Sequence, residues 1–105
     1  MKPDKILSLL GIVAKAGSIA SGEFQTEKAV KEGKAYLVIV AGDASANTKK
    51  KFADMCAYYE VPYHAYADRE QLGHCIGKEF RASLAVTNEG LAKSLIRHFE
   101  ALTTE

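Results

Sequence analysis

The sequence has few cysteines, little net charge and no long apolar run, and each shortage excludes a class of protein. Cys56 and Cys75 belong to no C-x-x-C and face no matching histidine pair, so neither a structural zinc site nor a disulfide framework is expected. Two unpaired buried thiols in a reducing cytoplasm are expected instead. The net charge of +1 lacks the strongly basic footprint of many nucleic-acid binders, so any polyanion site must be a local patch.

Membrane and secretion signals are also missing. The opening MKPDKILSLLGIVAKAG is interrupted by Ser8 and Gly11, reads as amphipathic, and is too short to span a bilayer. It has no signal-peptide cleavage pattern. We therefore expect a cytoplasmic protein with no membrane partner.

Motifs for catalysis do not occur in the sequence. It contains no P-loop, no G-x-G-x-x-G and no G-x-S-x-G. His64, His74 and His98 have no companion motif and are interpreted as surface or packing residues. Asp43 follows an apolar run but has no glycine-rich loop before it, so it fits a turn. The sequence predicts no enzyme, no metal and no cofactor.

Caps and glycines divide the first half of the chain into alternating helices and strands. Asp4 is expected to cap a first helix that Gly17 ends. A short edge strand at residues 18–21 and a second helix at about 23–32 follow. Residues 35–41 form an apolar run without polar alternation, which predicts a strand buried on both faces.

The second half repeats this alternation. Asn47, Asp68 and Asn88 are expected to cap three further helices. Strands are expected at residues 61–67 and 82–87. The residues expected to face inward from the third and the last helix are Phe52, Met55, Cys56 and Tyr59, and Leu91, Leu95, Phe99 and Leu102.

Helices that alternate with strands over short connections indicate an α/β domain, with helices on both faces of a mixed sheet of about four strands. The length of 105 residues suits one core. No internal repeat, low-complexity segment or linker interrupts the chain. A single domain over residues 1–105 is expected, with a frayed end at 103–105.

Residues 17–34 hold the strongest candidate for a binding site. Gly22 at a helix entrance lets a partner approach the backbone, where the first N–H groups and the helix dipole suit phosphate. Gln25 and Lys28 lie three residues apart on one face, and these side chains could bind a base edge and a phosphate. The local spacing alone is more typical of an ordinary solvated helix start.

Residues 76–83 form a second candidate, a connection that combines Gly77, Lys78, Phe80 and Arg81. Backbone freedom, an apolar side chain and two cations can press against an unstacked base and its phosphates. Alone, this signal is weak. The two candidates come from distant parts of the chain, and the fold decides whether they meet.

Two other features can be explained without a ligand. The lysines at 49–51 are expected in the first turn of a helix, where they oppose its dipole, and are interpreted as a solvated face rather than a phosphate contact. The tyrosines fit packing as well as base stacking.

Three pieces of sequence together resemble a known family. They are LLGIVAKAGSIASGEFQTEKAVKEGKAYLVIVAGDAS, the VPY at 61–63, and LGHCIGKEFRASLAV. Their order and spacing resemble the kink-turn RNA-binding ribosomal proteins, the superfamily of the archaeal large-subunit protein L7Ae and its L30e relatives. Within it, the likeness is to the small bacterial members called YlxQ-like. The resemblance covers nearly the whole chain and implies a three-layer α/β/α sandwich.

The resemblance also implies an RNA site. The helix that begins near Gly22 would enter a kink-turn and read its tandem sheared G·A pairs, and the loop at 77–83 would pack against a flipped-out nucleotide. Phe24 stands where many members carry Asn or Lys, and Glu23 and Glu27 reduce the local positive potential. Lys31 and Lys34 would give support that does not depend on base sequence. The RNA-contacting residues expected are Gly22, Glu23, Phe24, Gln25, Thr26, Lys28, Lys31, Gly77, Lys78, Phe80 and Arg81.

The leading hypothesis is a non-catalytic, monomeric RNA-binding protein that recognises a kink-turn or a related motif in ribosomal or other structured RNA. The alternative is a protein-interaction module, accessory to the ribosome or translation factors, that has lost specific RNA binding. An exposed Phe24 and the near-neutral charge would favour this alternative.

Overall fold

Helices and strands alternate along residues 4–103, the part of the chain that the computed structural model describes. The order predicted from caps and glycines is confirmed. Residues 104 and 105 of the segment expected to fray lie outside the described part. The elements are α1 (Lys5–Lys15), β1 (Ile19–Ser21), α2 (Glu23–Lys31), β2 (Leu37–Val40), α3 (Ala46–Tyr59), β3 (Tyr63–Ala65), α4 (Arg69–Cys75), β4 (Ser83–Val86) and α5 (Glu89–Thr103).

The sheet has the strand order β1-β4-β2-β3. β4 runs antiparallel to both neighbours, while β2 and β3 are parallel, so the predicted mixed sheet of four strands is confirmed. Every residue of β2 and β4 is buried, as the unbroken apolar run at 35–41 predicts for its strand. The observed strands are shorter than the predicted ranges.

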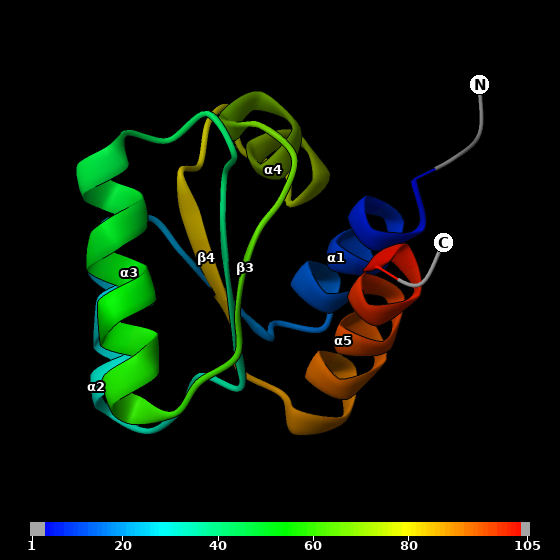
Figure 1. Cartoon of the computed structure of the whole chain (residues 1–105). Helices are drawn as coiled ribbons and strands as arrows, with labels where there is room; N and C mark the ends of the chain where they lie inside the picture. Colours follow the sequence, from blue (N-terminus) through cyan, green and yellow to red (C-terminus); the bar gives the residue numbers. More distant parts are fainter. Residues whose placement is uncertain (1–3, 104–105) are drawn as a thin grey trace.

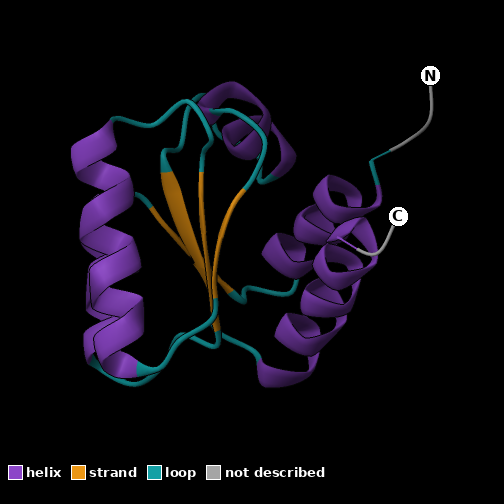
Figure 2. Ribbon diagram, viewed as in Figure 1, coloured by secondary structure: helices purple, strands orange, loops and turns teal. Residues whose placement is uncertain are grey.

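Helices cover both faces of the sheet (Figure 1). In that view α2 and α3 pack together on one side, and α1 and α5 pack together on the other. α4 lies at the upper end of the sheet and packs against α1 (Figure 2). The three-layer α/β/α arrangement expected from the resemblance is thus observed. Among residues 4–103, no helix combines the length and apolar character needed to cross a bilayer.

Predicted caps at both ends of the chain are confirmed. Asp4 Oδ1 accepts a hydrogen bond from the Leu7 N–H at 2.9 Å and so caps α1. The same carboxylate accepts from Tyr66 Oη at 2.6 Å, which ties the start of α1 to the segment after β3. Asp68 forms a capping box on α4, and Asn88 Oδ1 accepts from the Leu91 N–H at 3.0 Å at the start of α5.

The prediction that Asn47 caps the third helix is wrong. Ser45 is the cap, since its Oγ accepts from the Thr48 N–H at 3.1 Å. Asn47 therefore lies inside the first turn of α3, and the lysines at 49–51 fall in the next turn, where the helix dipole opposes them less. A serine and an asparagine are both good caps, so local pattern alone could not choose between them.

Two residues expected in the core are exposed instead. Tyr59 is 41% exposed and Leu102 is 51% exposed. Each lies in the last turn of a long helix, and 14 or 15 helical residues extend further than a strand of four residues. The helix ends therefore overhang the sheet. The other predicted inward residues of these helices are buried or partly buried against the core.

The cysteines and one histidine have packing roles. Cys56 is buried as expected, whereas Cys75 is only partly buried, and both thiols are free. Burial raises the pKa of each thiol to about 11. His64 stacks on Phe99 with ring centroids 4.2 Å apart, and burial lowers the pKa of His64, as suits a packing histidine.

Candidate nucleic-acid interface

Gly22 joins β1 to α2 and adopts a backbone conformation that few other residues allow. Its φ is +93°, its N–H donates to the Ser83 carbonyl at 2.9 Å, and its carbonyl accepts from the Thr26 N–H at 2.9 Å. A Cβ built at this position would meet nothing within 4 Å. Glycine is required here by the backbone, and the space beside it is open to a partner.

The outer face of α2 presents the predicted polar pair. Gln25 and Lys28 are exposed, and no ion pair within residues 4–103 involves Lys28. Lys28 separates two shallow grooves of about 370 and 160 Å³, the first lined also by Phe24 and the second by Gln25. Phe24 is 73% exposed. These side chains stand free for a ligand.

Thr26 does not belong to this exposed face. Its side chain is completely buried, and Ser83 Oγ donates to Thr26 Oγ1 at 3.3 Å, which links α2 to β4. The expectation that Thr26 contacts RNA is therefore wrong for its side chain. A helix repeat shows which residues share a face but not which face a four-stranded sheet will cover.

The acidic residues of α2 are neutralised by lysines. Lys51 Nζ from α3 lies 2.8 Å from Glu23 Oε1 and 2.6 Å from Glu27 Oε1, and Lys31 Nζ lies 2.8 Å from Glu27 Oε2. Hydrogen bonds from Lys31 and then Lys51 lower the pKa of Glu27 to about 2. The hydrogen bonds that Lys51 donates to Glu23 and Glu27 raise the pKa of Lys51.

This pairing changes the interpretation of three predicted residues. Glu23 and Lys31 are held in surface ion pairs rather than left free, and Lys34 pairs with Glu32 at 3.3 Å. Lys51, which was predicted to lie on a solvated face, instead neutralises Glu23 and Glu27, the two carboxylates that reduce the positive potential near the start of α2. The pairing spans 28 residues, so no local pattern could have found it.

The loop between α4 and β4 is held by backbone and side-chain bonds. Gly77 has a φ of +79°, and the Arg81 N–H donates to the Arg69 carbonyl at 3.0 Å. A Cβ on Gly73 would lie 2.6 Å from the Glu79 carbonyl oxygen, so only glycine lets the loop fold back against α4. Gly73 was not among the predicted site residues.

Three exposed or partly exposed side chains of this loop are accessible to a ligand. Lys78 is exposed, Phe80 is 60% exposed, and Arg81 is partly buried. Arg81 Nη1 donates to the Phe80 carbonyl at 2.6 Å, and its Nε donates to Ser21 Oγ at 3.2 Å. Neither Lys78 nor Arg81 forms an ion pair within the described range.

The fold brings the two candidate segments together. Ser21 is the register partner of Leu84, which places the end of β1 beside the start of β4. The Gly22–Ser83 and Arg81–Ser21 hydrogen bonds then connect the start of α2 directly to the α4–β4 loop. The result is one surface with Gln25 and Lys28 on one side and Lys78, Phe80 and Arg81 on the other, here called the α2–loop face.

Two residues that support this face were not predicted as part of it. Ser21 positions Arg81, and Asp43 Oδ1 accepts from the Arg69 N–H at 2.9 Å, with Asp43 Oδ2 3.5 Å from Arg69 Nε. Asp43 thereby fixes the start of α4. Its prediction as a turn residue missed this contact, since the partner is 26 residues away. Within residues 4–103, no group of three His, Cys, Asp or Glu side chains is placed to hold a metal ion.

Comparison with known proteins supports the fold and identifies the family. The model of the ribosomal protein L7Ae/L30e/S12e/Gadd45 family matches residues 4–96. The protein named RNA-binding protein YlxQ from Bacillus subtilis is 46% identical over 84% of this chain and 88% of its own length. A protein of the same name from Enterococcus faecium is 38% identical over 85% of each chain.

Two solved structures have the same fold as this chain. A Bacillus halodurans protein of unknown function superposes with a TM-score of 0.88 at 40% identity, covering 90% of this chain and 96% of its own. The Giardia lamblia 15.5kD RNA binding protein gives a TM-score of 0.81 at 23% identity, covering 97% and 93%, a likeness in fold. On the family match and these relatives together, the chain belongs to the ribosomal protein L7Ae/L30e/S12e/Gadd45 family, as a YlxQ-like member.

Proposed function

We propose that this chain is a non-catalytic RNA-binding protein that recognises a kink-turn or a related internal loop. Its target would be ribosomal RNA or another structured RNA of the cytoplasm, bound by a protein monomer. Membership in the family and the name RNA-binding protein carried by the YlxQ relatives support the broad function. The geometry of the α2–loop face supports the narrower one.

The observation that carries the proposal is the junction of two segments at one edge of the sheet. The start of α2 and the α4–β4 loop are joined by the Gly22–Ser83 bond at 2.9 Å and the Arg81–Ser21 bond at 3.2 Å. One segment offers free backbone N–H groups and polar side chains, while the other offers an exposed aromatic ring and two cations. A bent RNA presents both base edges and an unstacked base, and this pair of segments matches that combination.

Each part of the face then has a role. The N-terminus of α2 beside Gly22 approaches the RNA backbone, because its first N–H groups point outward and carry partial positive charge. Gln25 and Lys28 contact the exposed edges of the G·A pairs. Phe80 and Arg81 cover the extruded base through stacking and cation contacts. Binding would select the bent conformer of the RNA, and no bond is made or broken.

The experiment is a titration of the protein against a fluorescently labelled kink-turn RNA. The control is the same RNA with Watson–Crick pairs in place of its tandem G·A pairs. We expect tight binding to the first RNA and a large loss with the second. Equal, weak binding to both RNAs would contradict kink-turn recognition.

One observation favours the alternative of a protein-interaction module. Phe24 is 73% exposed at the entrance of α2, where it stands in place of a polar side chain, and exposed aromatic residues are common at protein interfaces. The dependence of RNA binding on salt separates the two functions. A steep decrease of affinity with salt indicates phosphate contacts, whereas affinity that persists at high salt would favour a protein partner.

A further inference from the structure

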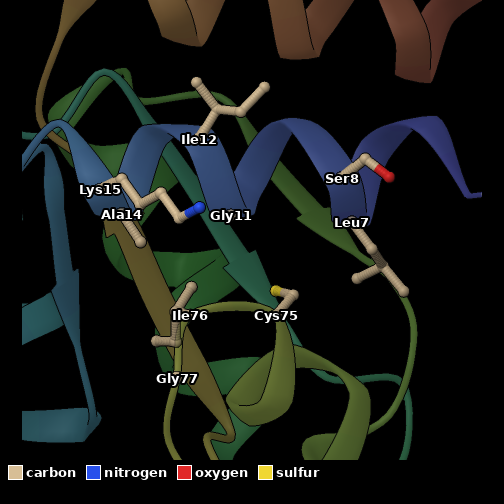
Figure 3. Close-up of a pocket in the computed structure, with 9 residues that line it drawn as sticks. All are labelled: Leu7, Ser8, Gly11, Ile12, Ala14, Lys15, Cys75, Ile76 and Gly77. Atoms are coloured by element: carbon tan, nitrogen blue, oxygen red, sulfur yellow. The ribbon is translucent and has the colours of Figure 1, made fainter.

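A groove separates α1 from the end of α4, outside the α2–loop face (Figure 3). Its volume is about 590 Å³. Figure 3 shows Leu7 and Ala14 of α1 on one side and Cys75 and Ile76 on the other, which makes these walls apolar. Lys15 lies at one end of the groove. The mixture of apolar walls and a cation suits a ligand with flat apolar and anionic parts.

Glycine keeps the two walls close. A Cβ on Gly11 would lie 3.1 Å from the Cys75 carbonyl oxygen, so a larger residue would push α1 and α4 apart. Gly11 therefore lets α1 and α4 approach closely at a point where both helices line the groove.

The groove adjoins the α2–loop face at Gly77. Gly77 lines it and also lines a second groove of about 710 Å³, whose other walls are His74, Lys78, Glu79 and Arg81. A ligand that extends past Arg81 and Gly77 would therefore reach the groove beside α1.

The charges along this path favour an anion. The two grooves are lined by three cationic side chains and one carboxylate. The cations are Lys15, Lys78 and Arg81, and the carboxylate is that of Glu79. Lys15 forms no ion pair with any residue in the described part of the chain. Its position in the last turn of α1 complements the helix dipole, but the ammonium group remains available to a phosphate.

We propose that the groove between α1 and α4 binds unpaired nucleotides that extend from the end of a stem of the bound RNA. This inference rests on the proposed function, because the nucleotides arrive from the α2–loop face. Lys78 and Lys15 neutralise successive parts of the sugar–phosphate backbone, while a base lies against Leu7 and Ile76. The RNA footprint then extends around α4 to α1, beyond the residues predicted from the sequence.

The experiment compares three RNAs. The first is a minimal kink-turn with blunt stems, and the others carry an added single-stranded tail of about six uridines at the 5′ or the 3′ end. We expect one of the tails to lower the Kd about tenfold and to steepen the log–log salt dependence by about 0.7 for each phosphate contacted. Lys15→Glu should abolish this gain and leave binding of the minimal RNA within about twofold of the wild type.

Two further variants complete the design. Lys15→Gln should reduce the gain without reversing the charge, and Lys5→Glu is the matched control, since Lys5 is exposed on the same helix but does not line the groove. The inference is overturned if neither tail tightens binding, or if Lys5→Glu acts as strongly as Lys15→Glu. An equal loss for the minimal and tailed RNAs in Lys15→Glu overturns it too. Failure of the minimal RNA to bind would instead overturn the proposed function, and this inference with it.

Discussion

Arg81 Nε donates a hydrogen bond of 3.2 Å to Ser21 Oγ, across 60 residues of sequence. Ser21 ends β1 and directly precedes Gly22, so the bond fixes a loop side chain relative to the start of α2. Arginine has five N–H donors, and the Nη1 bond to the Phe80 carbonyl leaves others free for a ligand. The bond therefore joins the two candidate segments, the start of α2 and the α4–β4 loop, into one surface.

Ser21→Ala should weaken kink-turn binding through Arg81. Without the hydroxyl, Arg81 loses one of its two side-chain anchors and samples more orientations, so we expect the Kd to rise about three- to tenfold. The same substitution in an Arg81→Ala background should have no further effect. Additive losses in this double-mutant cycle would show that Ser21 acts independently of Arg81.

Lys28→Ala should cost on the order of 1 to 3 kcal/mol of RNA-binding free energy, if the ammonium contacts a base. The free energy of unfolding should change little, because Lys28 is exposed and forms no ion pair among residues 4–103. Lys93→Ala is the control, since Lys93 lies on α5 on the opposite side of the sheet. Unchanged binding by Lys28→Ala would remove this residue from the site.

Lys51→Ala should weaken RNA binding although Lys51 need not touch the RNA. Its removal leaves the Glu23 carboxylate uncompensated and takes one of two lysines from Glu27, which makes the potential beside the start of α2 more negative. The effect should shrink at high salt. Lys50→Ala is the matched control, because Lys50 is exposed on α3 and, among residues 4–103, forms an ion pair only with Asp54. An equal effect of the two variants would contradict a local role for Lys51.

Glu27 should make stability depend on pH in acid. Its pKa is about 2 in the folded chain against an ordinary value of 4.5, so the unfolded chain takes up the proton first as the pH falls. The stabilisation is fully present above about pH 5 and decreases toward pH 2. Denaturant unfolding of wild type and Glu27→Gln should show a gap at the higher pH that closes at the lower one. A gap independent of pH would contradict the ion pairs.

Thr26→Val should destabilise the fold and spare the RNA site. The substitution leaves the buried Ser83 hydroxyl without its acceptor, at a cost of about 1–3 kcal/mol in the free energy of unfolding. Adding Ser83→Ala should recover part of this loss, because no polar group then remains unpaired. RNA affinity should be unchanged where the variant is folded. A selective loss of affinity would mean that Thr26 affects the site directly.

The fold was largely predictable because local residue types, such as helix caps and glycines, determine where its helices begin and end. Asp4, Asp68 and Asn88 cap helices through their own side chains, and Gly17 ends α1 with a φ of +74°. The apolar run at 35–41 contains β2. The helix cap was predicted wrongly where two good capping residues, Ser45 and Asn47, lie close together. Burial was predicted wrongly where a helix extends beyond the sheet, as at Tyr59.

The site was predictable only in part, because its geometry depends on long-range contacts. The segments around Gly22 and Gly77 could be proposed from residue types, but their junction depends on β1 pairing with β4, which no short pattern specifies. The same holds for Lys51, whose partners belong to another helix, and for Thr26, whose burial follows from how α2 rests on β4.

Fluorescence energy transfer between the two arms of a kink-turn RNA tests most directly whether the protein selects a bent RNA. Added protein should raise the transfer, because the α2–loop face selects the bent conformer. The same RNA without its tandem G·A pairs should show little change, and Lys28→Ala should shift the rise to higher protein concentration. Protein binding that leaves the transfer between the arms unchanged would contradict the central claim.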